Sequence, residues 1–399
     1  MHDSLMVAEI TLSIVLLTGA GLAISGLLAL RGQSLGYNPQ NALTFLLPLS
    51  EGHYTQWASR LALHQGIVKR LRRAPQVEAA AVSVTGTPPY NGFRTKVMLD
   101  DRPASEAPEL RVNLVQDEYF ATVGTRLLRG RDLTEADILQ GKPVAVVSED
   151  MVRRDFQNKD PLGHHIQVDI FNQTLPPQLL KAPQFNNSFE IVGVAGTARN
   201  QGLDQPPMPA MFIPYSILIP PETFIIARTT GDPEKLAPLA REAVRSVDPN
   251  QPITLTRTLE GWLDTATAYP RFATFLFGVF GGIGLLLAVA GVFSVVSYGV
   301  AHRTREFGIR MALGAKPQDV LQLVLLTTGR VLVAGLVVGL AISIAASRML
   351  ADRMQGMGIA NPLLFVIVGG VLLFAALAAC VVPARSATLI QPIEALRHE

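Results

Sequence analysis

Four long runs of apolar residues interrupt the otherwise mixed pattern of this 399-residue chain. The first extends from Val7 to Leu30 with Glu9 as its only charge, and the others cover 272–301, 320–348 and 362–383. Runs of about 20 apolar residues can cross the roughly 30 Å hydrocarbon core of a bilayer, and a helix satisfies their backbone groups there. The pattern therefore predicts four transmembrane helices. A signal peptide is the alternative for the first run, which lacks a basic start and exceeds the usual ~7–15 apolar residues.

Basic residues in the short loops predict the orientation. The segment 302–319 carries Arg303, Arg305, Arg310 and Lys316, whereas the loop 349–361 carries only Arg353. Cytoplasmic loops are enriched in Lys and Arg. We therefore expect 302–319, the N-terminal residues 1–6 and the tail 384–399 to be cytoplasmic, and 31–271 to lie outside the cytoplasm.

The long outer region shows strand and helix periodicity of its own. Two β-α-β patterns, over about 41–90 and 222–262, flank a middle segment, about 91–221, that is rich in alternating apolar residues and Pro-rich loops. The predicted fold class is an α-helical membrane protein with four transmembrane helices and an α+β extracytoplasmic domain, in which a split β-α-β domain carries a mostly β insert.

Residues that could carry catalysis are scarce. The only cysteine, Cys380, falls in the fourth apolar run, and the one histidine pair, His164-His165, lacks acidic or thiol neighbours at ligand spacing. No GxxxxGK followed by Ser or Thr occurs, so no phosphate-binding loop is present in these residues. We expect no catalytic residue and no metal site. The basic cluster at 69–73 is expected to be a solvated helix end.

Glycine pairs in two apolar runs have the spacing that allows close helix approach. Gly278 and Gly282 form one pair, and Gly335 and Gly339 form the other. We interpret them as helix-packing positions, with a lipid-facing coincidence as the alternative.

Two charged residues lie within apolar runs, near their expected cytoplasmic ends. Glu9 is in the first run and Arg330 in the third. Anchoring at the membrane surface is the favoured interpretation, since long side chains reach the interface, and an ion pathway is the alternative.

The charged segment between the second and third runs is amphipathic. Glu306 and Arg310 are four residues apart in the order that stabilises a helix, and apolar residues lie between them. The residues alone leave two interpretations open, a helix resting on the headgroups or a docking helix for a cytoplasmic partner.

The same segment, RTREFGIRMALGAKPQDVLQLVL, resembles the cytoplasmic-loop signature of FtsX-like permeases of MacB-type ABC transporters. The ending PARSATLIQPIEALRHE resembles the C-terminal tail of that family. In the outer region, VQDEYFATVGTRLLRGRDLTEAD and DPLGHHI resemble the MacB-like periplasmic core domain, with His164 where a Lys or Arg is usual.

The resemblance implies a permease with a porter-like periplasmic domain, located in the bacterial inner membrane. It implies that the permease forms a homodimer or pairs with a second permease half. It also implies a cytoplasmic ABC ATPase, which would bind ATP and magnesium, so that this chain itself needs no cofactor. A periplasmic adaptor or an outer-membrane channel is a further implied partner. No nucleic acid is implied. The segment that would face the ATPase consists of Arg303, Arg305, Glu306, Phe307, Gly308, Ile309, Arg310, Leu313, Gly314 and Ala315.

Two questions stay open at this level. The opening residues also resemble the second repeat of duplicated permeases, so the chain is interpreted either as a half-length relative or as half of such a protein. The predicted function is export or extraction of an amphipathic substrate driven by a partner ATPase. The alternative is a non-transporting, FtsX-like regulator of a periplasmic partner such as a cell-wall hydrolase.

Overall fold

A computed structural model describes residues 2–50, 52–99, 107–302, 317–353 and 362–388. The chain divides into two compact units. The helical unit contains residues 1–33 and 268–399, and the outer unit contains residues 34–267.

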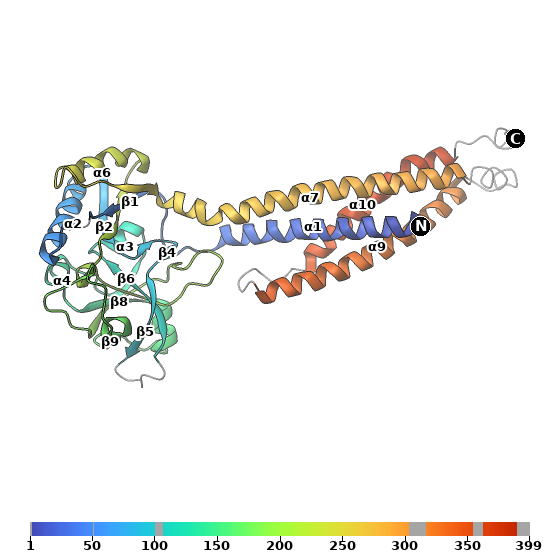
Figure 1. Ribbon diagram of the computed structural model, residues 1–399. Coiled ribbons are helices and arrows are strands. Elements are labelled where there is room, and N and C mark those ends of the chain that lie inside the picture. Colours follow the sequence, from blue (N-terminus) through green and yellow to red (C-terminus); the bar gives the residue numbers. More distant parts are fainter. Residues whose placement is uncertain (1, 51, 100–106, 303–316, 354–361, 389–399) are drawn as a thin grey trace. The chain divides into compact units, whose positions relative to one another are not determined.

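Four long helices make up the described part of the helical unit (Figure 1). They are α1 (His2–Gly32), α7 (Leu259–His302, whose first residues belong to the outer unit), α9 (Pro317–Arg353) and α10 (Pro362–Thr388). Each contains a segment long and apolar enough to cross a membrane, which confirms the four predicted spans. α7 begins at Leu259, upstream of the predicted 272, because the hydroxyl of Thr258 accepts a hydrogen bond from the Gly261 N–H and caps the helix there.

The core of the helical unit is formed by aliphatic side chains from all four helices. α1 packs against both α9 and α10, and α9 packs against α10. The buried cluster consists of Met6, Ile10, Ile14, Val292, Val296, Val300, Leu332, Leu372, Ala376 and Cys380. In a bilayer such contacts stabilise a bundle by close packing, because lipid tails are as apolar as the side chains.

The outer unit contains a four-stranded antiparallel arrangement in the order β2-β14-β1-β15. Its strands are β1 (Ala42–Pro48), β2 (Val77–Ser83), β14 (Glu222–Thr229) and β15 (Thr254–Thr258). Helix α2 (Trp57–Arg72) connects β1 to β2, α6 (Leu236–Arg245) connects β14 to β15, and the two helices contact each other (Figure 1). Strand β14 lies between β1 and β2, and β1 lies between β14 and β15, so each β-α-β unit has a strand of the other unit between its own two strands. This is the ferredoxin-like split β-α-β topology.

The residues between β2 and β14 form a closed ring of strands in the described structure. The ring runs β6-β5-β9-β11-β8-β12 and closes because β12 also pairs with β6. Its strands are β5 (Phe93–Leu99), β6 (Glu109–Val115), β8 (Val144–Ser148), β9 (His165–Val168), β11 (Phe189–Ala195) and β12 (Ala210–Pro214). Closure removes exposed strand edges, and β6 joins the ring to β2 through the pair Ser83↔Val115.

Short elements complete the outer unit. They are β3 (Gly86–Thr87), β4 (Tyr90–Asn91), α3 (Tyr119–Val123), β7 (Leu127–Gly130), α4 (Glu135–Gln140), α5 (Glu149–Asp155), β10 (Leu180–Lys181), β13 (Leu218–Ile219) and the 3-10 turns η2 (Asp169–Asn172), η3 (Tyr215–Ile217) and η4 (Pro233–Lys235). One apolar core extends through both halves and the ring. The predicted fold class, a split β-α-β domain with a mostly β insert on four spans, is confirmed.

Candidate functional site

The predicted ATPase-facing segment, Arg303 to Ala315, lies outside the described residues. Helix α7 ends at His302 immediately before it, and α9 begins at Pro317, two positions after Ala315. The segment therefore joins two of the four spanning helices. Its role stays a prediction.

The two predicted glycine pairs have different surroundings. A Cβ at Gly335 would lie 2.8 Å from Ile10 Cγ2, and one at Gly339 would lie 3.0 Å from Ile14 Cβ, so α9 approaches α1 closely at both positions. At Gly278 and Gly282, apart from the helix's own neighbouring residues, no atom of the described chain would come within 4 Å of a Cβ. Packing by this second pair stays a prediction.

A different set of glycines on α7 faces α1. A Cβ at Gly281 would lie 3.4 Å from Leu17 Cδ2, and one at Gly284 would lie 3.5 Å from the Cα of Ser13. Ser13 also donates a 2.7 Å hydrogen bond to the carbonyl of Gly284. A four-residue glycine spacing does not identify these positions, because Gly281 and Gly284 are three residues apart.

The charged residues within the spans also differ in their surroundings. Glu9 is half-buried and its carboxylate lies against Gly291 of α7, where any larger residue would overlap it. Arg330 of α9 is exposed. The structure thus places Glu9 at a helix contact, and surface anchoring of either residue stays a prediction.

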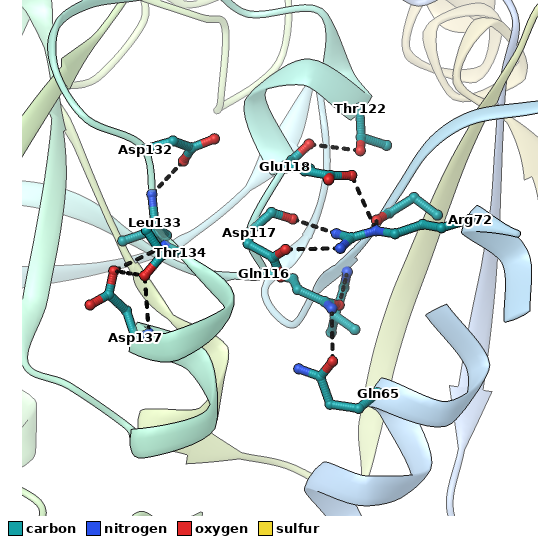
Figure 2. Close-up of polar contacts among 12 residues, drawn as sticks. Gln65, Arg72, Gln116, Asp117, Glu118, Thr122, Asp132, Leu133, Thr134 and Asp137 are labelled. Carbon is teal, nitrogen blue, oxygen red and sulfur yellow. Dashed lines mark hydrogen bonds and ion pairs between the residues drawn. The ribbon is translucent and has the colours of Figure 1, made fainter. Parts of the chain in front are cut away.

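In the outer unit, Arg72 at the end of α2 ties three segments together (Figure 2). Its guanidinium donates 2.8 Å hydrogen bonds to a carboxylate oxygen and to the carbonyl of Asp117, and a 2.9 Å bond to the carbonyl of Ala80 in β2. Glu118 lies 3.2 Å from the same guanidinium. The basic cluster at 69–73, which includes Arg72, is predicted from the sequence to be a solvated helix end. That interpretation is wrong for Arg72, because the side chain is half-buried and paired with Asp117 and Glu118, which lie 45 and 46 positions further along the chain.

Two carboxylates near this junction have opposite pKa shifts. Burial raises the pKa of Asp132 to about 6, and the neighbouring charges of Asp117 and Glu118 add to the rise. Burial alone would also raise the pKa of Asp137, but hydrogen bonds from Arg131 and Thr134 hold it below its ordinary value. Asp132 therefore exchanges its proton in a pH range where Asp137 remains charged.

Buried polar side chains of α2 hold segments that precede β14 and the start of β14 itself. Arg60, 5% exposed, donates to the carbonyls of Gln178 at 2.9 Å and Ile219 at 2.7 Å, and burial lowers its pKa. The ring of His64 contacts the Thr223 hydroxyl at 2.7 Å, and complete burial lowers the pKa of His64 to about 4, so this histidine is neutral at physiological pH.

These groups hold backbone segments in place. Arg60 and Arg72 direct most of their donors at main-chain carbonyls, and within the described residues no three His, Cys, Asp or Glu side chains come together as metal ligands. The four spans and the outer α+β unit define a multi-pass membrane protein that carries a large folded α+β domain.

Comparison with known families identifies the family. Residues 4–246 match the MacB-like periplasmic core domain, and residues 278–392 match the FtsX-like permease C-terminal domain. The chain belongs to the MacB/FtsX-type family of ABC transporter permeases.

Individual relatives are distant. The ABC transporter permease YknZ of Bacillus subtilis is 24% identical over 315 residues, which cover 76% of this chain and 74% of YknZ. The macrolide export ATP-binding/permease protein MacB of Chromobacterium violaceum is 26% identical over 291 residues, which cover 71% of this chain but only 42% of MacB. The crystal structure of the periplasmic region of MacB from Actinobacillus actinomycetemcomitans covers 59% of this chain at 14% identity with a TM-score of 0.37.

Proposed function

We propose that this permease works with a cytoplasmic ATPase and converts ATP-driven movement into a conformational change of the outer unit. That change would export or extract an amphipathic substrate. The observation that carries the proposal is the match of one chain to both a MacB-like core domain and an FtsX-like permease domain.

The order of elements suits such transmission. Helix α7 contains residues of the outer unit at its start and reaches His302, next to the segment that resembles the family's cytoplasmic loop. Since an α-helix rises about 1.5 Å per residue and resists compression, displacement at one end is carried along its axis. The proposal assigns Arg303 to Ala315 as the contact with the ATPase.

The remaining parts of the proposal follow from the family. The proposal locates the protein in the bacterial inner membrane with both termini in the cytoplasm, working as a homodimer or with a second permease half. ATP and magnesium bind the ATPase partner, since these 399 residues contain no phosphate-binding loop. A periplasmic adaptor or an outer-membrane channel is a further expected partner. MacB relatives are named as macrolide exporters, which supports export as the direction of transport here.

Reversal of one charge pair tests the coupling. The full chain is purified from its native membrane with any associated ATPase, and ATP hydrolysis is measured for wild type, for Glu306→Arg, for Arg310→Glu and for both changes together. Each single reversal turns the i, i+4 pair into two like charges and places the wrong charge against a docked partner, so we expect it to lower ATPase activity or recovery at least 5-fold. An outer-unit reversal, Glu190→Arg, is the control, since Glu190 is an exposed residue of β11.

Recovery of no ATPase with the wild-type chain would overturn the proposal. Unchanged ATPase recovery and activity in both single reversals would overturn the role of the segment. Co-purification of a cell-wall hydrolase, together with ATP-dependent activation of that hydrolase, would instead favour the regulator.

A further inference from the structure

The outer unit contains an apolar cavity of about 480 Å³ where the four-stranded sheet meets the strand ring. The sheet contributes Leu46 and Phe224, the ring contributes Phe93 and Leu114, and the loops that follow β9 and β13 complete the wall. The cavity size falls within the roughly 300–1,000 Å³ of small-molecule sites, which are mostly apolar with a few polar groups.

The lining side chains are only partly covered by the protein. Those that are half-buried are Leu46, Val84, Thr85, Phe93, Ile170, Leu175, Leu179, Pro220, Pro221 and Phe224. Each contributes apolar surface that remains in contact with water in the free protein. Covering that surface with an apolar ligand is favourable by roughly 25 cal/mol for every Å² removed from water.

The cavity wall is held from behind. Strands β10 and β13 pair through Leu180↔Ile219, which joins the two wall loops to each other. Arg60 bonds to the carbonyl of Ile219 and the Trp57 indole N–H donates to the carbonyl of Ser216, so α2 anchors the same wall. The N–H of Leu49 donates to the carbonyl of Pro221 at 2.8 Å. The wall is thus organised before any ligand arrives, which lowers the entropy cost of binding.

Among the described lining residues, one carries a charge. Glu222 is exposed at the start of β14, and Thr85 provides the one side-chain hydroxyl. A carboxylate beside an apolar chamber is complementary to a molecule with an apolar body and a basic amine, and it repels a carboxylate at the same place.

We propose that this cavity binds an amphipathic organic cation, with its apolar body among the aromatic and proline side chains and its ammonium group at Glu222. The identification of this ligand as transported cargo rests on the proposed transport function. The binding itself needs neither ATP nor an ATPase.

The two tryptophans allow a direct measurement. Trp57 and Trp262 both belong to the outer unit, and Trp262 contacts the cavity residue Phe224 with ring centroids 6.1 Å apart. The probe is dansylcadaverine, which joins a naphthalene sulfonamide to a primary amine and accepts energy from tryptophan. The full chain is placed in nanodiscs, and sensitised dansyl emission is titrated. Empty nanodiscs correct for probe dissolved in lipid.

Charge recognition is tested with a matched probe and matched variants. 6-(Dansylamino)hexanoic acid has the same aromatic body and a carboxylate in place of the amine. We expect saturable energy transfer with the amine and at least 5-fold weaker affinity for the acid. Glu222→Gln should weaken the amine at least 5-fold without weakening the acid, whereas Glu190→Gln, a neutralisation of the exposed residue on β11, should bind as wild type.

Occupancy of the cavity is tested with Val84→Phe, which adds volume at a half-buried lining position. We expect at least 5-fold weaker binding of dansylcadaverine, in a variant whose thermal unfolding matches wild type.

No saturable energy transfer in the wild-type chain, or equal binding of dansylcadaverine by Val84→Phe and wild type, would overturn the site. Equal effects of Glu222→Gln and Glu190→Gln would overturn cation recognition. Because no ATP is present, these results are independent of the coupling test at Glu306 and Arg310.

Discussion

At the scale of single residues, the Asp132 carboxyl makes one pH-dependent contribution to the stability of the outer unit. Its carboxylate accepts a 2.6 Å hydrogen bond from the Leu133 N–H and lies near Asp117 and Glu118 (Figure 2). The folded-state pKa of about 6 exceeds the ordinary value of 3.8, so folding favours the protonated form. The Asp132 carboxyl is therefore expected to lower the stability of the outer unit as pH rises from about 4 to 6 and to change it little above that range. Buried His64, whose pKa is lowered to about 4, acts in the opposite direction over the same rise in pH.

Asp132→Asn should remove this loss. The amide oxygen still accepts the Leu133 N–H, while the buried charge is gone, so we expect stabilisation on the order of 2 kcal/mol at pH 7.5 and almost none at pH 4. Thermal unfolding followed by tryptophan fluorescence at both pH values measures it. Asp160→Asn is the matched control, since Asp160 is exposed and accepts the N–H of Leu162. Equal behaviour of the two variants at pH 7.5 would contradict the assignment.

At the scale of elements, the helix contacts depend on which side of each helix its glycines occupy. Gly335 lies against Ile10, whereas Gly278, apart from the helix's own neighbouring residues, has no described atom within 4 Å of a Cβ position. Both lie in spans with the same small-residue spacing. The spacing is therefore a necessary feature of a close contact and is not sufficient to identify one.

Gly335→Leu should loosen the contact between α1 and α9, with Gly278→Leu as its control. Overpacking at a tight contact costs about 1–3 kcal/mol, and both changes gain the same helix propensity, which cancels in the comparison. Cys380, the only cysteine, is buried among the side chains of the same bundle core and reports opening through its labelling by a maleimide dye. We expect faster labelling of Gly335→Leu than of Gly278→Leu. Equal rates would count against the contact.

At the scale of the whole molecule, each unit has its own reporter. The tryptophans belong to the outer unit, and Cys380 belongs to the helical unit. Arg72→Met leaves Asp117, 7% exposed, without its cation, so we expect the outer unit to lose roughly 3 kcal/mol of stability. The tryptophan transition should move to lower temperature, and Cys380 labelling should stay as in wild type. Arg72→Lys should lose less stability than Arg72→Met. A change in both the tryptophan transition and the rate of Cys380 labelling would contradict independent unfolding of the two units.

The sequence alone determined the four spans, the split β-α-β halves and the β-rich insert. These features depend on local patterns: a span needs only enough consecutive apolar residues, and a strand or helix shows its own period. The resemblance to one family also lay in contiguous motifs, at residues 115–137 and 303–325.

Only the tertiary structure decided the closure of the strand ring, the partners of Arg72 and the walls of the apolar cavity. Strand β12 pairs with β6, about 100 positions earlier in the chain, and no local pattern states which of several similar apolar strands will be neighbours. The cavity is lined by segments from Leu46 to Phe224, which become adjacent only when the sheet and the ring pack together. Periodicity shows which side of an element is apolar, and long-range packing decides what that side meets.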